Sequence, residues 1–335
     1  MYDVTIIGTG PAGLYAAFYS GLRGMKTKLI DSQAVLGGKL HAYPEKMIWD
    51  VGGMPPVLGE QLITHLSEQA VLFDPTVALN TKVEGISQQE NGFLLSTAAG
   101  ESHTSKTVIL ATGSGILTPK KVGLSGEERF IQSNLHYTVK SLARFKDKVV
   151  LISGGGHSAV DWANTLEPIA KKVYVTYRKD HFTGHEADIQ KLLDSSVEVI
   201  YESVITGLNG TDVIESVTLN DTDKLAVDEV IINHGYDTVN DLIEQSDVTI
   251  NMHPEYGIQG TSMAETSVPG IYAAGDAINY DGKVNLIAGA FHDAANAVNR
   301  AKQFIEPAAV KTAMVSSHHE SFKTKNKKIY AELEL

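Results

Sequence analysis

The chain has 335 residues, of which 43% are hydrophobic and 20% charged, so it is long enough for about two globular domains with sizeable cores. Its net charge of -12 argues against nucleic acid and anionic membrane surfaces as partners, because both need many Lys and Arg residues to neutralise phosphate. It contains no cysteine, which excludes disulfides, thiolate metal sites, iron–sulfur ligation and any dithiol relay.

No apolar run reaches the ~18 residues that a membrane span needs, and the chain passes from Met1 almost directly into an apolar strand. We therefore expect neither a signal peptide nor a membrane association, and the cytoplasm is the expected location.

An apolar strand at residues 4–7 runs into Gly-Thr-Gly-Pro-Ala-Gly at 8–13, here called the first glycine loop, and then into a helix. Gly8 permits a tight turn, Gly10 lets the backbone approach a pyrophosphate, and Gly13 lets the helix pack closely on the strand. A second apolar strand, residues 27–30, ends in Asp31, an acid suited to a ribose hydroxyl pair. A plain tight turn would account for the glycines but not for Asp31, so the pattern predicts a bound dinucleotide.

The next segments alternate between loop, helix and strand patterns. Residues 32–50 are too long for a hairpin turn and predict a functional loop. Residues 58–72 have helical spacing, and alternating apolar residues predict strands at 76–79, 82–88, 92–97 and 102–111. The last strand is followed by a turn at Gly113, and Gly115–Gly126 is expected to be a crossover linker.

The opening pattern then recurs. An apolar strand at 148–153 precedes Gly-Gly-Gly-His-Ser-Ala at 154–159, the second glycine loop, and a helix to about residue 166. The next strand, 173–177, ends in Arg178 and Lys179 instead of an acid. A cationic pair there suits a 2'-phosphate, so NADP(H) is favoured over NAD(H), with an ordinary basic surface as the alternative.

Strands near 197–201, 204–208, 212–219 and 225–232 complete this second unit. A buried strand then ends in Gly275-Asp276, residues 287–304 have the spacing of a helix with one apolar face, and residues 307–335 predict an exposed basic tail. His181 and His185 have i,i+4 spacing, but Gly184 interrupts any helix there and no third ligand is indicated. We expect no metal site, and Lys120 and Lys121 are expected to lie on a solvated face.

Two glycine loops, one followed by an acid and one by bases, with Ala-Thr-Gly at 111–113 and Ala-Gly-Asp at 274–276, resemble the flavoproteins with two dinucleotide-binding domains. The layout is similar to thioredoxin reductase, which carries Cys-x-x-Cys shortly before its second loop. The corresponding run here, 134–140, has no sulfur. The chain most resembles the ferredoxin/flavodoxin–NADP reductases of the thioredoxin-reductase-like type, whose motifs match Leu36–Gly38, Tyr43–Lys46, Gly154–Ala163 and Gly282–Ala288.

This resemblance implies an α/β fold with two Rossmann-like (three-layer ββα) domains, the NADPH domain inserted into the FAD domain. The expected domains are 1–117 and 241–335 for FAD, the latter with a C-terminal extension, and 118–240 for NADPH. The implied function is electron transfer between NADP(H) and ferredoxin or flavodoxin by a homodimer with FAD and NADPH as cofactors. An NAD(P)H oxidase or quinone reductase of the same architecture, and a non-catalytic redox-sensing flavoprotein, remain alternatives.

The resemblance also assigns residues. FAD would contact Gly8, Gly10, Pro11, Ala12, Gly13, Asp31, Gly38, Lys39, Tyr43, Val83, Gly113, Leu117, Gly275, Asp276 and Ser317. NADPH would contact Gly154, Gly156, His157, Ser158, Ala159, Arg178 and Lys179. Within these sets Tyr43 would stack on the flavin and Asp276 would bind the ribityl chain.

Two departures from the family pattern stand out. Lys39 takes the place of a common Gln, and Thr183 takes the place of a third Arg. No catalytic acid or base is expected, because hydride passes directly to flavin N5 and the protein supplies binding, orientation and electrostatics.

Overall fold

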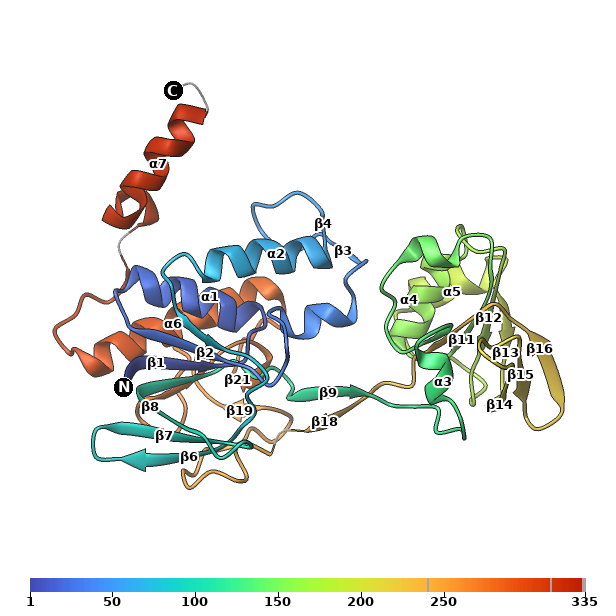
Figure 1. Ribbon diagram of the computed structural model, residues 1–335, viewed down its shortest axis with the longest axis horizontal. Coiled ribbons are helices and arrows are strands. Elements are labelled where there is room, and N and C mark those ends of the chain that lie inside the picture. Colours follow the sequence, from blue (N-terminus) through green and yellow to red (C-terminus); the bar gives the residue numbers. More distant parts are fainter. Residues whose placement is uncertain (240, 314, 333–335) are drawn as a thin grey trace. The chain divides into compact units, whose positions relative to one another are not determined.

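The computed structural model describes residues 1–239, 241–313 and 315–332, apart from the side chains of residues 117, 238, 239, 324 and 328. It divides into two compact units (Figure 1). The first contains residues 1–41, 46–116 and 239–335, and the second contains 42–45 and 117–238. The second unit is therefore inserted into the first. The sequence predicted the breaks after residues 117 and 240 and placed 42–45 in the first domain.

A seven-stranded sheet forms the centre of the first unit, in the order β5-β2-β1-β8-β7-β6 with β20 paired to β8. β1, β2, β5 and β20 run parallel with the second half of β8, whereas β6 and β7 add an antiparallel hairpin. Val4, Ile6 and Leu29 are fully buried, because parallel strands are covered on both faces. The strand bounds are β1 Tyr2–Ile7, β2 Thr27–Ile30, β5 Thr76–Ala78, β6 Val83–Gln89, β7 Gly92–Thr97, β8 Ser102–Leu110 and β20 Ile271–Ala273.

Helices α1 (Pro11–Leu22), α2 (Gly59–Ala70) and α6 (Ile287–Ile305) lie together on one face of this sheet (Figure 1). The smaller elements of the unit are η1 Gly38–Ala42, β3 Met47–Ile48, β4 Val57–Leu58, β19 Ile258–Gln259, η3 Gly275–Ala277, β21 Ile278–Asn279, η4 Ser316–His318 and α7 Glu320–Glu332. Among the described residues, no helix is long and apolar enough to cross a membrane.

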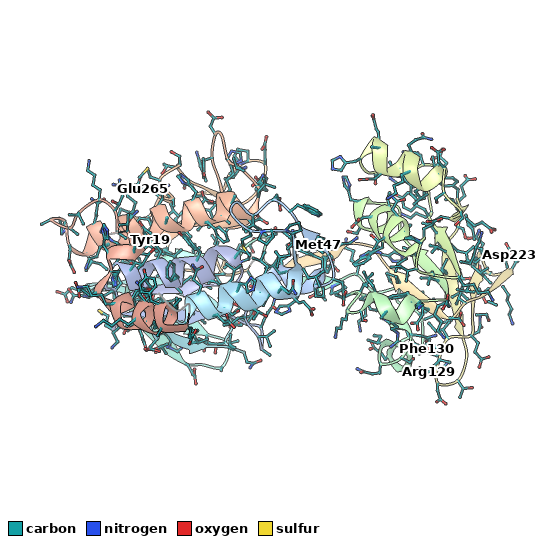
Figure 2. The ribbon with its side chains drawn as sticks, turned by 90° about the horizontal axis from the view of Figure 1, so that it is seen from above. Tyr19, Met47, Arg129, Phe130, Asp223 and Glu265 are labelled. Carbon is teal, nitrogen blue, oxygen red and sulfur yellow. The ribbon has the colours of Figure 1, made fainter. Side chains whose placement is uncertain are left out.

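The segment after α6 is bonded to α1. The hydroxyl of Tyr19, labelled in Figure 2, accepts hydrogen bonds from the Ala313 amide (3.2 Å) and from Nδ2 of Asn299 (3.4 Å). Further along, the rings of His319 and Phe322 contact Phe73 at centroid distances of 5.5 and 5.4 Å. The tail predicted from the sequence therefore contains a helix, α7, whose described lysines are exposed.

The second unit has a parallel five-stranded sheet in the order β10-β17-β11-β12-β13. Val150 and Ile152 pack toward α4 on one face, and Leu151 packs toward the antiparallel sheet β14-β15-β16 on the other, so the unit has three layers. Its strands are β10 Leu135–His136, β11 Val149–Ser153, β12 Lys172–Thr176, β13 Glu198–Ile200, β14 Ile205–Asn209, β15 Ser216–Leu219, β16 Asp223–Ala226 and β17 Glu229–Ile232. The paired strands β9 Ile116–Pro119 and β18 Tyr236–Val239 each contain a point at which the chain passes from one unit to the other. Its helices are α3 Glu128–Ile131, η2 Leu142–Phe145, α4 His157–Leu166 and α5 Glu186–Leu193.

The predicted α/β class with two Rossmann-like units is confirmed, while several elements differ. The strand expected at 225–232 is two strands, β16 and β17, separated by residues 227 and 228. Residues 181–185 are not helical, as Gly184 indicated, but helix α5, which follows the N-cap His185, was not predicted. The expected linker at 115–126 includes β9, which pairs with β18.

Candidate functional site

The first glycine loop follows β1 at its carboxyl end. Gly8 has a φ of +104°, and a Cβ there would lie 2.3 Å from the carbonyl oxygen of Ala111. A Cβ at Gly13 would lie 1.9 Å from the carbonyl oxygen of Gly8. The fold itself therefore needs glycine at both positions, because any side chain would separate α1 from the strands.

Gly10 differs from these two. Its backbone is extended, with φ -70° and ψ -177°, and a Cβ there would meet no atom of the described residues within 4 Å. Two distant segments nevertheless close around the loop: a Cβ at Gly38 would lie 2.8 Å from Cα of Gly10, and a Cβ at Gly275 would lie 3.0 Å from Cβ of Ala12. The loop thus offers open space above Gly10 and the start of α1, which suits a group that approaches the backbone, such as a pyrophosphate.

Asp31 follows β2 and lies against this loop. Its Oδ2 accepts hydrogen bonds from the amide of Thr9 (2.7 Å) and the hydroxyl of Thr9 (2.6 Å), and its Oδ1 accepts one from the amide of Gln33 (2.9 Å). These bonds hold a nearly buried carboxylate in one position beside the loop. The sequence analysis missed Thr9; its only signal is a hydroxyl residue between the first two glycines.

Asp276 lies in η3, directly after β20, and is exposed. The turn is held by Asp293 on α6, whose Oδ2 accepts a hydrogen bond from the Gly275 amide (3.1 Å). The fully buried Asp293 also accepts a hydrogen bond from Tyr280 (2.6 Å) and pairs with the buried Lys283. Removing one partner of a buried ion pair costs about 3–5 kcal/mol. Asp293 therefore holds the turn that carries Asp276. The only signal for Asp293 in the sequence is that an acidic residue stands three positions after Ala290 on an apolar helix face.

The other residues expected around FAD lie in different parts of the structure and differ in their exposure. Lys39 is exposed in η1. Val83 is buried in the core with Ile7 and Ile30. Tyr43 belongs to the segment 42–45 that groups with the second unit, and the side chain of Leu117 lies outside the described part of the structure.

Ser317 is not brought to the first glycine loop of its own chain. It lies exposed in η4, next to His319, whose ring contacts Phe73. Phe73 in turn covers Gly21, where a Cβ would lie 2.3 Å from the Phe73 ring. Gly21 is near the C-terminal end of α1, about 16 Å along the helix from Gly10 at a rise of ~1.5 Å per residue.

The second glycine loop lines a cavity of about 720 Å³ that lies entirely within the second unit. Here too the first glycine is required by the fold, because a Cβ at Gly154 would lie 2.5 Å from the carbonyl oxygen of Asn233. Gly156 is extended (φ -92°, ψ -179°), and in the described part of the chain no atom lies within 4 Å of a Cβ position there. His157 and Ser158 follow at the exposed N-terminus of α4. In both loops, therefore, the fold requires the first glycine, whereas the glycine two positions later faces open space.

The cavity is lined by cationic and neutral residues. No Asp or Glu belongs to its described lining, whereas Arg178, Lys120 and Lys121 do, although the whole chain carries a net charge of -12. Both lysines are exposed, as the sequence predicted, and they also line this cavity. Lys179 is exposed and is not part of the lining. The cavity is thus suited to a polyanion.

His234 lines the same cavity, and its Nε2 is 2.9 Å from Oγ of Ser153. Partial burial and the positive charge of Arg178 lower the pKa of His234. The ring of Tyr177 covers Gly155, where a Cβ would lie 2.2 Å from the ring. The amide of Thr183 donates to the carbonyl oxygen of Gly155 (2.8 Å), so Thr183 supports the loop.

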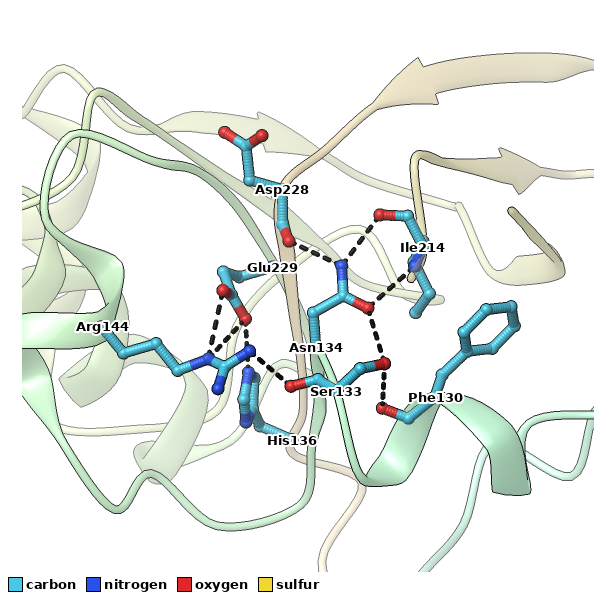
Figure 3. A network of polar contacts seen from close by, with 8 residues as sticks. All are labelled: Phe130, Ser133, Asn134, His136, Arg144, Ile214, Asp228 and Glu229. Atoms are coloured by element: carbon cyan, nitrogen blue, oxygen red, sulfur yellow. Dashed lines mark hydrogen bonds and ion pairs between the residues drawn. The ribbon is translucent and has the colours of Figure 1, made fainter. Parts of the chain in front are cut away.

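The run 134–140 contributes to a hydrogen-bond network at the amino end of β17 (Figure 3). Nδ2 of Asn134 donates to the carbonyl oxygens of Ile214 (2.8 Å) and Asp228 (2.7 Å). Nε2 of His136 lies 2.6 Å from Oε2 of Glu229, and Nε of Arg144 donates to the same carboxylate at 3.0 Å. This run therefore has a structural role, in a region where thioredoxin reductases, by the resemblance above, carry their dithiol.

Comparison with known proteins agrees with these two loops. The model of the pyridine nucleotide-disulphide oxidoreductase family matches residues 2–301. "Ferredoxin–NADP reductase 1" of Bacillus cytotoxicus is 57% identical over 99% of this chain and 98% of its own length. The chain belongs to the ferredoxin–NADP reductases of this family. "Ferredoxin–NADP reductase 2" of Exiguobacterium sibiricum is 56% identical over 99% of this chain and 97% of its own length.

Solved structures with a similar fold include thioredoxin reductases. The enzyme from Lactococcus lactis is 28% identical, with a TM-score of 0.71 over 91% of this chain and 99% of its own. The enzyme from T. acidophilum is 25% identical, with a TM-score of 0.71 over 90% of this chain and 98% of its own. The family resemblance predicted from the sequence is therefore confirmed, in a chain without cysteine.

Proposed function

We propose that this chain is an FAD-dependent oxidoreductase that transfers electrons between NADP(H) and ferredoxin or flavodoxin. The observation that carries the proposal is the pair of glycine loops. Each loop has a glycine, Gly10 or Gly156, that faces open space and that the fold itself does not require. One loop is followed by Asp31, and the other opens into a cavity whose described lining contains Arg178 and no Asp or Glu. The kinship with ferredoxin–NADP reductases supports the same activity.

FAD is assigned to the first unit. The residues proposed to hold it are Gly8, Gly10, Pro11, Ala12, Gly13, Asp31, Gly38, Lys39, Gly113, Gly275 and Asp276, with Tyr43, Val83, Leu117 and Ser317 at its borders. Asp31 fits the adenosine ribose, because its anchored carboxylate lies beside the loop, and Asp276 fits the ribityl chain, because it is exposed on a turn that contacts Ala12 through Gly275. When bound, FAD supplies the exchange between two-electron hydride chemistry and one-electron transfer.

NADPH is assigned to the second unit. The residues proposed to hold it are Gly154, Gly156, His157, Ser158, Ala159 and Arg178, with Lys179 outside the cavity lining. The free amides at the N-terminus of α4 favour a pyrophosphate, and Arg178 favours a 2'-phosphate. No side chain has to move a proton in this scheme, because the protein orients the cofactors and excludes water.

An activity panel tests the proposal. NADPH-dependent reduction of ferredoxin, flavodoxin, a quinone, oxygen and thioredoxin is measured with one purified preparation. We expect reduction of ferredoxin or flavodoxin to dominate, none of thioredoxin, and no inhibition by alkylating reagents, because the chain has no thiol. Faster turnover with quinone or oxygen would identify an oxidase or quinone reductase instead, and no turnover with any acceptor would favour a redox sensor.

Cofactor selectivity is predicted to depend on Arg178. Replacing Arg178 and Lys179 together with Ala should narrow the NADPH/NADH ratio of kcat/KM by about 10- to 100-fold, since a hydrogen bond to a charged group contributes about 1.5–3 kcal/mol. Because only Arg178 lines the cavity, Arg178→Ala should account for most of the change and Lys179→Ala for little. Steady-state kinetics with both nucleotides measure this. An unchanged ratio in the double variant would contradict the assignment.

An acidic carrier needs a local positive patch on this acidic chain, and α7 provides one. Lys323, Lys325 and Lys327 are exposed on it, while the side chain of Lys328 is outside the described structure. Changing all four to Gln removes these charges and should raise the KM for ferredoxin or flavodoxin about tenfold at low ionic strength. Low ionic strength is needed because charge steering is screened beyond about 10 Å at 0.1 M salt. Activity with a small neutral dye is the control and should not change. A carrier KM that stays the same at low salt would remove α7 from this role.

We also propose a homodimer. The contact of His319 with Phe73 places the neighbouring Ser317 toward the end of α1 away from the first glycine loop, which supports a role for Ser317 at the FAD of a second copy. Sedimentation equilibrium of the FAD-loaded protein should give twice the chain mass. A monomer that still binds FAD would remove Ser317 from the site.

A further inference from the structure

The cavity of the second unit has a second group of cations, far along the chain from Arg178. Pro119, Lys120, Lys121 and Val122 form part of its lining. The amide of Lys120 donates to the carbonyl oxygen of Gly235 (2.9 Å), and the amide of Val122 donates to the hydroxyl of Tyr137 (3.0 Å). The main chain is therefore held on both sides of the two lysines.

Tyr137 is itself fixed by a buried acid. Its hydroxyl donates to Oε1 of Glu127 (3.2 Å), and Oε2 of Glu127 accepts hydrogen bonds from the amides of Gly123 (2.8 Å) and Leu124 (3.0 Å). Burial, together with the charge of Glu127, raises the pKa of Tyr137 to about 12, so the hydroxyl keeps the proton that it donates. Segment 119–124 is thus a preorganised wall of the cavity.

The sheet order separates these lysines from Arg178. Arg178 follows β12, whereas Lys120 is bonded to Gly235, which follows β17, and β11 lies between those strands. The second glycine loop and the N-terminus of α4 follow β11, so they lie between the two cationic groups. A dinucleotide with its 2'-phosphate at Arg178 would therefore present its pyrophosphate between α4 and the lysines.

Both lysines have partners that an anion can replace. Nζ of Lys120 is 3.4 Å from Oδ1 of Asp237, and Nζ of Lys121 is 2.5 Å from Oε1 of Glu128. All four side chains are about half exposed or more, and exposed ion pairs contribute only about 0–1 kcal/mol. A phosphate in the cavity can compete with such carboxylates.

We propose that Lys120 and Lys121 bind the pyrophosphate of the dinucleotide, whereas Arg178 reads its 2'-phosphate. The inference rests on the proposed function in one respect, that the second unit binds NADP(H). The two lysines then contribute affinity for the dinucleotide, and Arg178 contributes selectivity for the 2'-phosphate. The pyrophosphate is common to NADPH and NADH, so the lysines strengthen both complexes, and only Arg178 distinguishes them.

The test uses the FAD-loaded protein with Lys120→Gln and Lys121→Gln combined. Dissociation constants for NADP⁺, NAD⁺ and adenosine 2'-monophosphate are measured by calorimetric titration. We expect the variant to bind NADP⁺ and NAD⁺ about tenfold or more weakly, by equal factors, because both lose charge-assisted contacts to the pyrophosphate. Adenosine 2'-monophosphate has no pyrophosphate, so its binding should be unchanged in this variant and weakened by Arg178→Ala.

Lys171→Gln is the matched control, because Lys171 is exposed and lies outside the cavity lining; it should leave all three constants unchanged. Unfolding temperature and FAD content show whether each variant is intact. Unchanged NADP⁺ and NAD⁺ affinity in the double lysine variant would overturn the inference, and so would loss of NADP⁺ affinity alone. A wild-type protein that binds neither dinucleotide would instead overturn the proposed function.

Discussion

Replacing Gly10 with valine is expected to give a folded but colourless protein. The backbone at Gly10 is extended, a conformation open to any residue, and none of the atoms that the structure describes lies within 4 Å of a Cβ there. The substitution should therefore change the free energy of unfolding by no more than about 1 kcal/mol. The isopropyl group would, however, occupy the open space where the backbone meets the pyrophosphate of FAD. Flavin absorbance per chain and the unfolding temperature of the FAD-free protein measure the two effects.

Two other glycines serve as controls for this prediction. Gly13→Val should lose FAD by a different route, unfolding, because its Cβ would lie 1.9 Å from the Gly8 carbonyl oxygen. Gly52→Val should retain FAD, because Gly52 also has open space but lies in an exposed loop outside the proposed site. Stoichiometric FAD in the Gly10→Val protein would show that the first glycine loop does not hold the cofactor.

Gly156→Val is expected to abolish the use of NADP(H) while leaving FAD bound. Gly156 has the same extended backbone and the same open space as Gly10, but it lines the cavity of the second unit. A side chain there would separate the pyrophosphate from the N-terminus of α4, and we expect kcat/KM for NADPH to fall about 100-fold or more, corresponding to about 3 kcal/mol.

Rapid mixing separates this effect from damage to the flavin. The bound FAD of the Gly156→Val protein should be reduced by dithionite as in the wild type, yet only slowly by NADPH. Reduction by NADPH at the wild-type rate would contradict the assignment of the second glycine loop. Together with Gly10→Val, this variant tests whether each loop serves one cofactor.

The sequence alone was sufficient for those features that depend on near neighbours in the chain. A tight turn after an apolar strand requires Gly8 and Gly154, and the residue that ends the following strand, Asp31 or Arg178, carries its charge whatever the tertiary structure. Strand and helix periodicity likewise reports local burial, which is why most elements were predicted and why errors fell at short strands such as β16 and at α5.

The tertiary structure decided which distant side chains meet. The bonds of Thr9 to Asp31 and of Gly275 to Asp293 join residues 22 and 18 positions apart, and no local pattern encodes such pairs. Lys120 and Lys121 resemble any surface pair in the sequence; they line a cavity because Lys120 bonds to Gly235 and Val122 bonds to Tyr137. Ser317 shows the converse, since the sequence does not indicate that its neighbour His319 contacts Phe73, near the C-terminal end of α1. Hydrogen bonding and packing between remote segments form only when the sheets assemble, so these placements follow from the fold and not from the sequence pattern.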